Sequence, residues 1–379
     1  MTPAEAAAVA ADIKRDGAAL GLSAVRVADA DLSAAETRLV SWLDAGFHGE
    51  MDWMARHGTK RSRPAELVPG TCRIVSVRLD YFPPEAADAD AVLADGALGY
   101  VSRYALGRDY HKVLRNKLQR LATLTEARIG AFGYRAFVDS APVMERAIAE
   151  RAGLGWIGKH SNLIDARAGS WFFLGELYTD LPLPVDPPLP TEHCGSCTRC
   201  LDACPTNAIV APYRVDARRC LSYHTIELAG PIPVEFRRAM GNRIYGCDDC
   251  QLACPFDKFR RDTDVDDFAP RHGLDAASLV DLFGWDEPRF ERLMLGSPIR
   301  RLGHERWLRN VAVALGNAPA SGEVRRALEA RADHPSALVR EHVAWALAEQ
   351  AGRAARDAPP EVPRARSVPI DRTPRPSHR

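Results

Sequence analysis

Eight of the nine cysteines lie in one stretch of the chain, and seven of them form two runs whose spacing is that of iron–sulfur ligands. The runs are Cys194-x2-Cys197-x2-Cys200-x3-Cys204-Pro205 and Cys247-x2-Cys250-x3-Cys254-Pro255. In bacterial ferredoxins, three thiolates of such a run bind one 4Fe–4S cluster, and the cysteine before proline crosses to the other cluster. The spacing therefore predicts a two-cluster electron-transfer module.

The second run is one ligand short, because Ile244 stands where its first cysteine would be. Cys220 lies between the runs and can fill the vacancy. We therefore expect two sets of four ligands. They are Cys194, Cys197, Cys200 and Cys254 for one cluster, and Cys204, Cys220, Cys247 and Cys250 for the other.

Two other interpretations of these cysteines, as structural zinc ligands or as disulfides, are less well supported by the sequence. CxxC pairs also bind structural zinc, but zinc sites pair cysteines two by two, whereas each run here continues to a Cys-Pro. A disulfide framework is disfavoured because the chain is long and lacks a signal peptide. Cys72, the ninth cysteine, lies beside an apolar run and is expected to be a small buried hydrophobe.

The composition sets wide bounds. The chain has 379 residues, enough for two or three domains. Lys+Arg and Asp+Glu both number 50, so any surface for nucleic acid must be local. The Ala-rich N-terminus lacks the apolar core of a signal peptide, and no apolar run is long enough to span a bilayer. We expect a cytoplasmic protein with no membrane partner.

Helices and strands interleave in residues 1–180, which indicates an α/β or α+β domain. We expect helices over 4–20, 33–46, 109–128 and 143–152, and strands over 22–27, 72–79, 135–138, 163–166 and 171–178. The last two strands are expected to form a hairpin through residues 167–170. The helix over 109–128 has a basic face, which is either solvated or meets a phosphate backbone.

Asp139 follows a predicted strand and precedes a predicted helix. It either caps that helix or acts as a general acid, if apolar surroundings raise its pKa. The nearby Gly153, Gly155 and Gly158 do not predict a Rossmann site, because they follow a helix rather than a strand.

The remaining chain divides at a Pro-rich linker, which begins at residue 181. Residues 275–350 read as all helix, with a weak repeat of Val311–Leu315 at Val343–Leu347. That pattern predicts HEAT-like pairs or an ordinary helical cap, and its arginines, Arg309 among them, favour nucleic acid. The predicted parts are 1–180, a ferredoxin-like 181–265, a helical 266–352 and a disordered Arg/Pro-rich tail 353–379.

Several long motifs resemble the epoxyqueuosine reductase family, and the resemblance covers about residues 1 to 350. Besides the first cysteine run, they are LVPG at 67–70, RYALGRDYH at 103–111, VDSAPVMER at 138–146, GLGWIGKHSNLI at 153–164 and YGCDDCQ at 245–251.

The resemblance implies a multidomain α+β protein. Its first domain would be a nitroreductase-like α/β fold that binds cobalamin, its ferredoxin module would pass electrons to the cobalt, and its HEAT-like repeat would grip a tRNA anticodon stem-loop. The implied reaction is the last step of queuosine synthesis, in which epoxyqueuosine at the wobble position of tRNA loses its epoxide oxygen as water. A reductase, ferredoxin or flavodoxin would donate the electrons to a monomeric enzyme.

The resemblance also implies roles for single residues. Asp139 matches the proton donor, which must stay protonated near neutral pH. Expected cobalamin contacts are Arg63, Tyr104, Asp139, Lys159, Ser161, Asn162, Ser222 and Asp248. No histidine lies in an obvious motif for replacing the cobalamin base.

Two rival functions remain. A cobalamin-dependent reductive dehalogenase shares the plan of one corrinoid and two clusters, but such enzymes are usually exported with a twin-Arg signal that this sequence lacks. The second is an iron–sulfur electron-carrier subunit with no substrate of its own.

Overall fold

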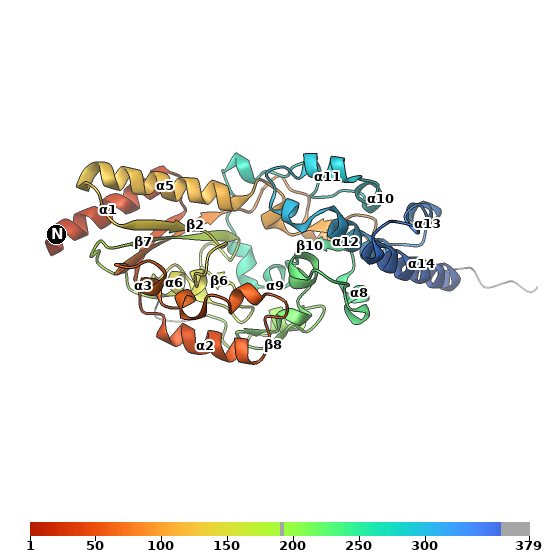
Figure 1. The fold of residues 1–379 in the computed structure, drawn as a ribbon, viewed down its shortest axis with the longest axis horizontal. Coiled ribbons are helices and arrows are strands. Elements are labelled where there is room, and N and C mark those ends of the chain that lie inside the picture. Colours follow the sequence, from red (N-terminus) through yellow and green to blue (C-terminus); the bar gives the residue numbers. More distant parts are fainter. Residues whose placement is uncertain (190–192, 358–379) are drawn as a thin grey trace, which may run out of the picture.

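The computed structural model describes residues 1–189 and 193–357. At one end of the elongated molecule lies a four-stranded sheet in the order β1-β2-β7-β4, with every neighbouring pair antiparallel (Figure 1). Its strands are β1 (Ala24–Asp29), β2 (Arg73–Asp80), β4 (Tyr134–Phe137) and β7 (Phe172–Thr179).

Helices cover both faces of this sheet. Helices α1 (Pro3–Ala19) and α5 (Tyr110–Ile129) share a core with Val75 and Val77, whereas α6 (Glu145–Arg151) packs on the face that carries Ile74. Residues of β2 face the two cores alternately, because side chains in a strand point to opposite faces with a period of two. Helix α2 (Ser33–Asp44) contributes Ala35 to the core on the α6 side. The first part is therefore a three-layer α/β/α unit, as the interleaved pattern predicts.

The predicted hairpin of residues 163–166 and 171–178 is wrong. Strand β6 (Leu163–Ile164) pairs with β5 (Trp156–Ile157), while β7 enters the main sheet between β2 and β4. Nearly every residue of β7 is buried. A strand with two apolar faces belongs in the middle of a covered sheet, where both of its edges are paired.

The Pro-rich linker is packed rather than free where it is described. The backbone N–H of Val27 donates to Asp186 Oδ2 at 2.8 Å, and the N–H of Asp186 donates to the Val27 carbonyl at 2.9 Å. Lys14 Nζ adds an ion pair to Asp186 at 2.6 Å. The linker therefore continues the pairing at the β1 edge of the sheet.

The cysteine-rich part is built from short elements. One cysteine of each run lies in a short helix, Cys200 in α7 and Cys250 in α9, and the two helices pack against each other. The helices are α7 (Arg199–Asp202), α8 (Val234–Met240) and α9 (Asp249–Leu252), a π-helix spans Tyr223–Glu227, and the strands are β8 (Ile209–Ala211), β9 (Arg214–Val215) and β10 (Arg243–Tyr245).

The C-terminal part is helical. Its helices are α10 (Leu279–Phe283), α11 (Glu287–Leu293), α12 (His304–Asn317), α13 (Gly322–Glu329) and α14 (Ala337–Asp357), with a 3-10 turn at Pro298–Leu302. The two copies of the weak repeat lie in α12 and α14, which pack against each other. Helix α14 includes residues 353–357, so the predicted disorder of the tail is wrong there, and 358–379 lie outside the described residues.

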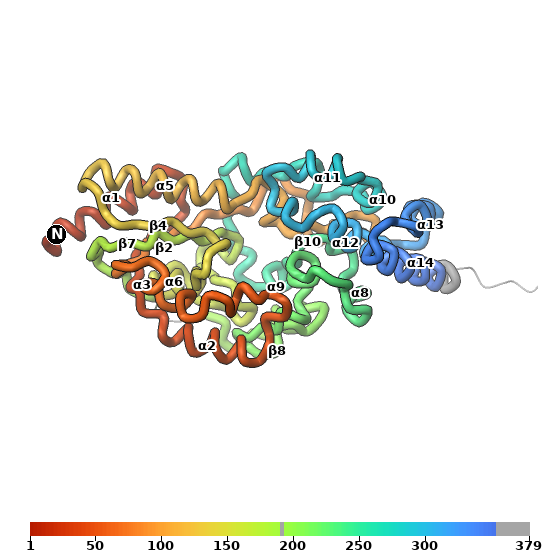
Figure 2. The backbone as a smooth tube through the Cα atoms, in the orientation of Figure 1, coloured from red at the N-terminus to blue at the C-terminus, as the bar shows by residue number. Residues whose placement is uncertain are grey.

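The predicted parts are interleaved rather than separate. After α4 (Ala89–Ala94), strand β3 (Tyr100–Val101) pairs in parallel with β10, and Val101 and Leu106 join the core of the C-terminal helices. In Figure 2 this orange segment runs beside the cyan and blue helices. A segment of the first predicted domain thus belongs to the core of the third. Across the described ranges, no helix combines the length and apolarity that crossing a membrane requires.

Candidate active site

The eight clustered cysteines lie near one another in the structure. The thiol pKa of Cys200 is raised to about 11 by burial and by the nearby Cys254, Cys194 and Cys197. Burial also raises the pKa of Cys250, whose thiol neighbours include Cys220, Cys204 and Cys200, and Cys250 in turn acts on Cys247. The division of these thiols between two clusters stays a prediction. No three His, Cys, Asp or Glu side chains within 1–189 and 193–357 form a site for a single metal ion.

Two predicted cofactor contacts, Lys159 and Ser222, lie against this cysteine region. Lys159 is buried, and its ammonium donates to the carbonyls of Gly195 at 2.5 Å and Cys197 at 2.9 Å. Ser222 hydrogen-bonds to Cys220. Both side chains therefore steady the loops that carry the thiols.

Cys72 departs from its prediction. Its thiol is half-buried and lies 3.2 Å from the carbonyl of Asp180, so it is a polar contact at the sheet edge rather than a fully buried hydrophobe.

Asp139 lies just after β4 in a left-handed conformation, with φ 48°. The helix that follows begins only at Glu145, and its preceding position is held by the apolar Met144. Asp139 instead donates its backbone N–H to the Glu145 carboxylate. The capping interpretation is therefore wrong, and the Asp139 carboxylate is left for other partners.

Those partners come from the start of α5. The Tyr110 hydroxyl donates to Asp139 Oδ2, and His111 Nε2 lies 3.3 Å from the same oxygen. His111 Nδ1 lies 2.8 Å from Asp109 Oδ1, and Arg301 holds Asp109 Oδ2 at 2.6 Å. A chain of charged groups thus runs from the C-terminal part of the molecule to Asp139.

The charges of this site oppose one another. Burial alone would raise the pKa of Asp139, but hydrogen bonds from His111 and Tyr110 outweigh it, and the pKa is lowered. Burial and the Asp139 charge raise the pKa of Glu145 to about 8. The requirement that Asp139 stay protonated is therefore not met by these protein groups alone, and at neutral pH the proton resides on Glu145.

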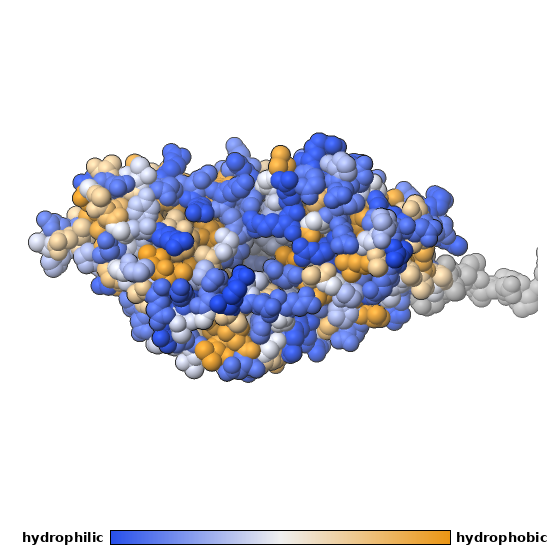
Figure 3. Space-filling view, in the orientation of Figure 1, coloured by the Kyte–Doolittle hydropathy of each residue, from blue (hydrophilic) through white to orange (hydrophobic). Residues whose placement is uncertain are grey.

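Asp139 is both surrounded and accessible. The surrounding protein desolvates it strongly, yet its side chain keeps 54% of its accessible surface. A side chain with both properties lines a concave space. In the space-filling view the surface is hollowed near the middle of the molecule (Figure 3).

A third carboxylate lies beneath this space. Glu176, in the middle of β7, is fully buried, and burial raises its pKa well above the ordinary value, with Glu145 and Asp139 adding to the shift. Among the described residues, neither of its oxygens has a hydrogen-bond partner, and the same holds for Ser76 Oγ and Tyr178 Oη. Such a cluster of buried polar atoms is typical of sites that hold ordered water.

The other predicted contacts are dispersed. The Tyr104 ring lies edge-on to Tyr110 at 6.0 Å, which places it beside Asp139. Ser161 and Asn162 lie in a half-buried loop. Arg146 donates a hydrogen bond to the Ser161 carbonyl at 2.6 Å and so fixes this loop beside α6. Within the described ranges, the side chains of these two loop residues make no hydrogen bond.

Asp248 and Arg63 are held by protein groups. The Asp248 carboxylate is buried and accepts from Tyr100 at 2.8 Å, from Ser102 at 2.6 Å and from the backbone of Arg103 at 2.9 Å. Arg63 is half-exposed and pairs with Glu36 at 2.8 Å and Glu66 at 3.2 Å, beside a surface groove of about 400 Å³. Both side chains have their hydrogen bonds taken by protein groups.

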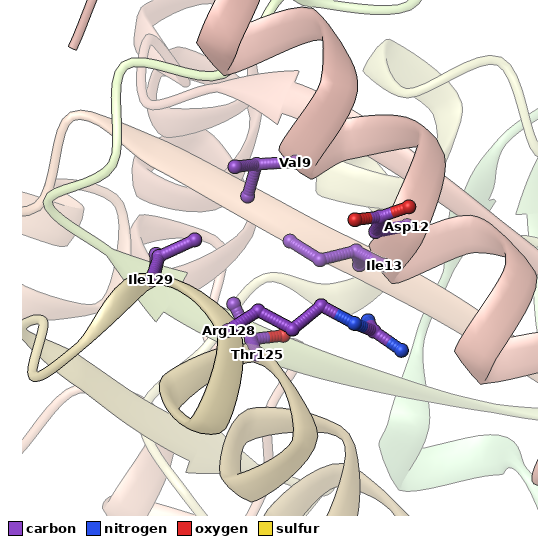
Figure 4. Close-up of a pocket in the computed structure, with 6 residues that line it drawn as sticks. All are labelled: Val9, Asp12, Ile13, Thr125, Arg128 and Ile129. Atoms are coloured by element: carbon purple, nitrogen blue, oxygen red, sulfur yellow. The ribbon is translucent and has the colours of Figure 1, made fainter.

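One small pocket is unrelated to this chemistry. It lies between α1 and α5, is lined by Val9, Ile13 and Ile129 among others, and has a volume of about 10 Å³ (Figure 4). It holds at most about one water molecule. On α5 it is lined by residues of the last turns, whereas the site uses Tyr110 and His111 of the first turn, so the pocket is not part of the site.

Residue-based reasoning identified Asp139 but not its partners. Asp109, Tyr110 and His111 belong to the motif RYALGRDYH, and Glu145 belongs to VDSAPVMER. Both motifs were visible, but nothing in the sequence states that the start of α5 meets the end of β4. Arg309 was misassigned: it is fully buried, and it donates to the carbonyls of Leu228 and His224.

Comparisons with known proteins agree with this architecture. Residues 193–257 match the family described as a 4Fe-4S double cluster binding domain, and residues 61–140 match the family described as "Epoxyqueuosine reductase QueG, DUF1730".

Full-length relatives are similar as well. An epoxyqueuosine reductase of Pseudomonas aeruginosa is 58% identical over 347 residues, which cover 92% of this chain and 96% of the relative. The one of Escherichia coli is 56% identical over 346 residues, covering 91% and 90%. A crystal structure of epoxyqueuosine reductase with an epoxyqueuosine-modified tRNA-Tyr stem loop matches with a TM-score of 0.81 at 28% identity, covering 93% of this chain and 94% of that one.

Proposed function

The chain belongs to the epoxyqueuosine reductase family, and from this we propose that it converts epoxyqueuosine at the wobble position of tRNA to queuosine. The observation that carries the proposal is the 58% identity over 92% of the chain and 96% of the relative. Such coverage includes all three described parts and every motif around Asp139.

The two thiol groups support the electron path. Residues 193–257 match a double-cluster domain, so two 4Fe–4S clusters belong to this chain. We assign Cys194, Cys197, Cys200 and Cys254 to one cluster and Cys204, Cys220, Cys247 and Cys250 to the other. The packing of α7, which carries Cys200, against α9, which carries Cys250, supports a short path between the clusters for electron transfer in single steps.

Cobalamin is the cofactor we propose for the open space. Its rim of amide groups needs polar partners, and Ser161 and Asn162 have unused hydrogen-bonding capacity at the site. Tyr104 and Asp139 would face the same group. When bound, cobalamin supplies a redox-active cobalt, while the protein orients the substrate and holds the protons.

Asp139 is the proton donor of this proposal. It lies in the concave space and is reachable by a substrate, as its 54% accessibility indicates. The corrin and the substrate would remove solvent from the carboxylate and so raise its pKa, which the protein groups alone do not do.

The C-terminal helices are the proposed tRNA-binding part, with a HEAT-like pairing of α12 and α14. Support comes from the related structure that holds a modified stem loop. Arg301, which is more than half exposed, reaches from this part to Asp109. RNA affinity should fall steeply as the salt concentration rises.

The test is nucleoside analysis of epoxyqueuosine-containing tRNA after anaerobic incubation with the reconstituted protein, cobalamin and a strong one-electron reductant. We expect queuosine to form in proportion to enzyme. Omission of cobalamin and unmodified tRNA serve as controls. Unchanged epoxyqueuosine with both clusters present and corrinoid bound would exclude the function, whereas protein that binds no corrinoid would support an electron carrier.

A further inference from the structure

His111 occupies a position that the proposed reaction does not yet use. Both of its ring nitrogens face carboxylate oxygens: Nδ1 lies 2.8 Å from Asp109 Oδ1, and Nε2 lies 3.3 Å from Asp139 Oδ2. A neutral imidazole has one N–H, so only the imidazolium can donate to both. The side chain is mostly buried, with 12% accessible, so the carboxylates rather than water are its partners.

The stoichiometry of the reaction requires more than one proton. Removing an epoxide oxygen as water consumes two electrons and two protons and leaves a carbon–carbon double bond. The electrons come singly from a low-potential donor through the clusters, and both protons end on the departing oxygen. One Asp139 carboxyl carries only one proton, so it must be reloaded within a turnover.

We propose that His111 is a proton-relay residue that reloads Asp139, with Asp109 and Arg301 fixing its orientation. The proton moves from His111 Nε2 to Asp139 Oδ2, and from Asp139 to the departing oxygen. The N–H that remains on Nδ1 stays bonded to Asp109, so the lone pair on Nε2 keeps facing Asp139. Solvent then returns a proton to His111. This relay rests on the proposed function and extends it.

The groups around His111 favour this assignment. Burial would lower the pKa of His111, but Asp109 and Asp139 outweigh it and raise the pKa above 6.5, while Arg301 acts against them. Arg301 Nη2 also lies 3.2 Å from Nδ1, and Tyr110 stacks beside the ring at 4.1 Å. Arg146 acts on Asp139, and Glu145 interacts electrostatically with both Asp139 and His111. Glu145 contacts only the backbone N–H of Asp139, so the geometry does not make it the relay.

The experiment compares wild type with His111→Gln and Asp109→Asn in single-turnover assays across pH. The wild-type rate should fall as pH rises through the pKa of His111. In His111→Gln this alkaline limb of the pH–rate profile should disappear, and the rate should fall by about 10²-fold. Cluster absorption, corrinoid binding and tRNA affinity should be retained. Asp109→Asn should move the limb to lower pH, because the neutral amide no longer stabilises the imidazolium. His272→Asn, which removes an exposed imidazole, is the matched control and should match wild type.

A second readout does not depend on turnover. Histidine-labelled NMR of the full chain without corrinoid should show His111 titrating above 6.5, and lower in Asp109→Asn and Asp139→Asn. His111→Gln with a wild-type profile and a rate within threefold would overturn the relay. If His111→Gln fails to fold, an unmoved limb in Asp109→Asn would do the same. Failure of wild type to form queuosine would instead count against the proposed function, since the NMR titration would be unaffected.

Discussion

Two aspartates, Asp139 and Asp248, show what separates a reactive carboxylate from a structural one. Asp248 is buried and is held at 2.6–2.9 Å by Tyr100, Ser102 and the backbone of Arg103. Asp139 is more than half accessible, and one of its partners, His111, is an imidazole that can take up or release a proton near neutral pH. The Asp248 carboxylate therefore joins segments of the fold through buried hydrogen bonds, and the Asp139 carboxylate has the surroundings that our proposed proton donor requires.

Asp139→Asn should have the largest effect on activity. The amide keeps the size and the left-handed preference of the side chain but cannot pass a proton, so single-turnover queuosine formation should fall by about 10²- to 10⁴-fold. The visible spectrum of the clusters and the thermal midpoint should stay as in wild type. If the Asp139→Asn variant kept wild-type activity, Asp139 would not be the proton donor, and its surroundings would not distinguish it functionally from Asp248.

Asp248→Ala should instead act on stability. Three buried donors lose their acceptor, at a cost of about 1–3 kcal/mol each, so unfolding should become easier by about 3 kcal/mol or more. Because Asp248 lies between Cys247 and Cys250, iron content per chain should fall as well. Asp248→Asn, which keeps one acceptor oxygen, should lie between the two in a denaturant titration. A variant with normal stability and poor corrinoid binding would restore Asp248 as a cofactor contact.

Glu145→Gln should change how stability depends on pH. In the folded chain the pKa of Glu145 is about 8, against an ordinary value of 4.5, so the folded state holds a proton that the unfolded state loses. The contribution of Glu145 to the free energy of unfolding is fully present below pH 4.5 and is lost as the pH rises to about 8. The lowered pKa of Asp139 acts only in more acidic solution. The thermal midpoint of wild type should therefore drop relative to Glu145→Gln by about 2–4 °C over this range, and parallel curves would contradict the shift.

Arg63→Ala should have the smallest effect. Its ion pairs with Glu36 and Glu66 are half-exposed, and such pairs contribute about 0.2–1 kcal/mol. Unfolding should shift by less than 1 kcal/mol, as measured beside Lys60→Ala, an exposed neighbouring cation. A large loss of corrinoid binding would show that Arg63 turns from these carboxylates to the cofactor.

Local patterns predicted local features well. The cysteine spacing predicted a two-cluster module, and residues 193–257 match a 4Fe-4S double cluster binding domain. Helix α5 follows from an amphipathic run with Leu114 and Leu118 on one side. Long-range pairing was not predictable in this way. Residue types allowed β6 and β7 to form a hairpin, and only the covered sheet explains why β7 is central.

The candidate site shows the same limit. Asp139 stood out because a carboxylate followed a strand, but the groups that surround it include His111 and, through Asp109, Arg301, which approach from α5 and from the turn at Pro298–Leu302. Arg309 looked like an RNA contact because arginine is usually exposed. In the structure its guanidinium group is buried and donates hydrogen bonds to three backbone carbonyls. Sequence composition cannot distinguish these two uses of a guanidinium group.

The hydrogen bond from Tyr100 to Asp248 joins positions 148 residues apart. On the ribosome, where synthesis proceeds at about 5–20 residues per second, this interval lasts about 7–30 s. The first cysteine run is made within it, but each proposed cluster also needs cysteines of the second run, which flank Asp248 in the sequence. Neither cluster can therefore be completed before the segment that accepts this hydrogen bond has been synthesised.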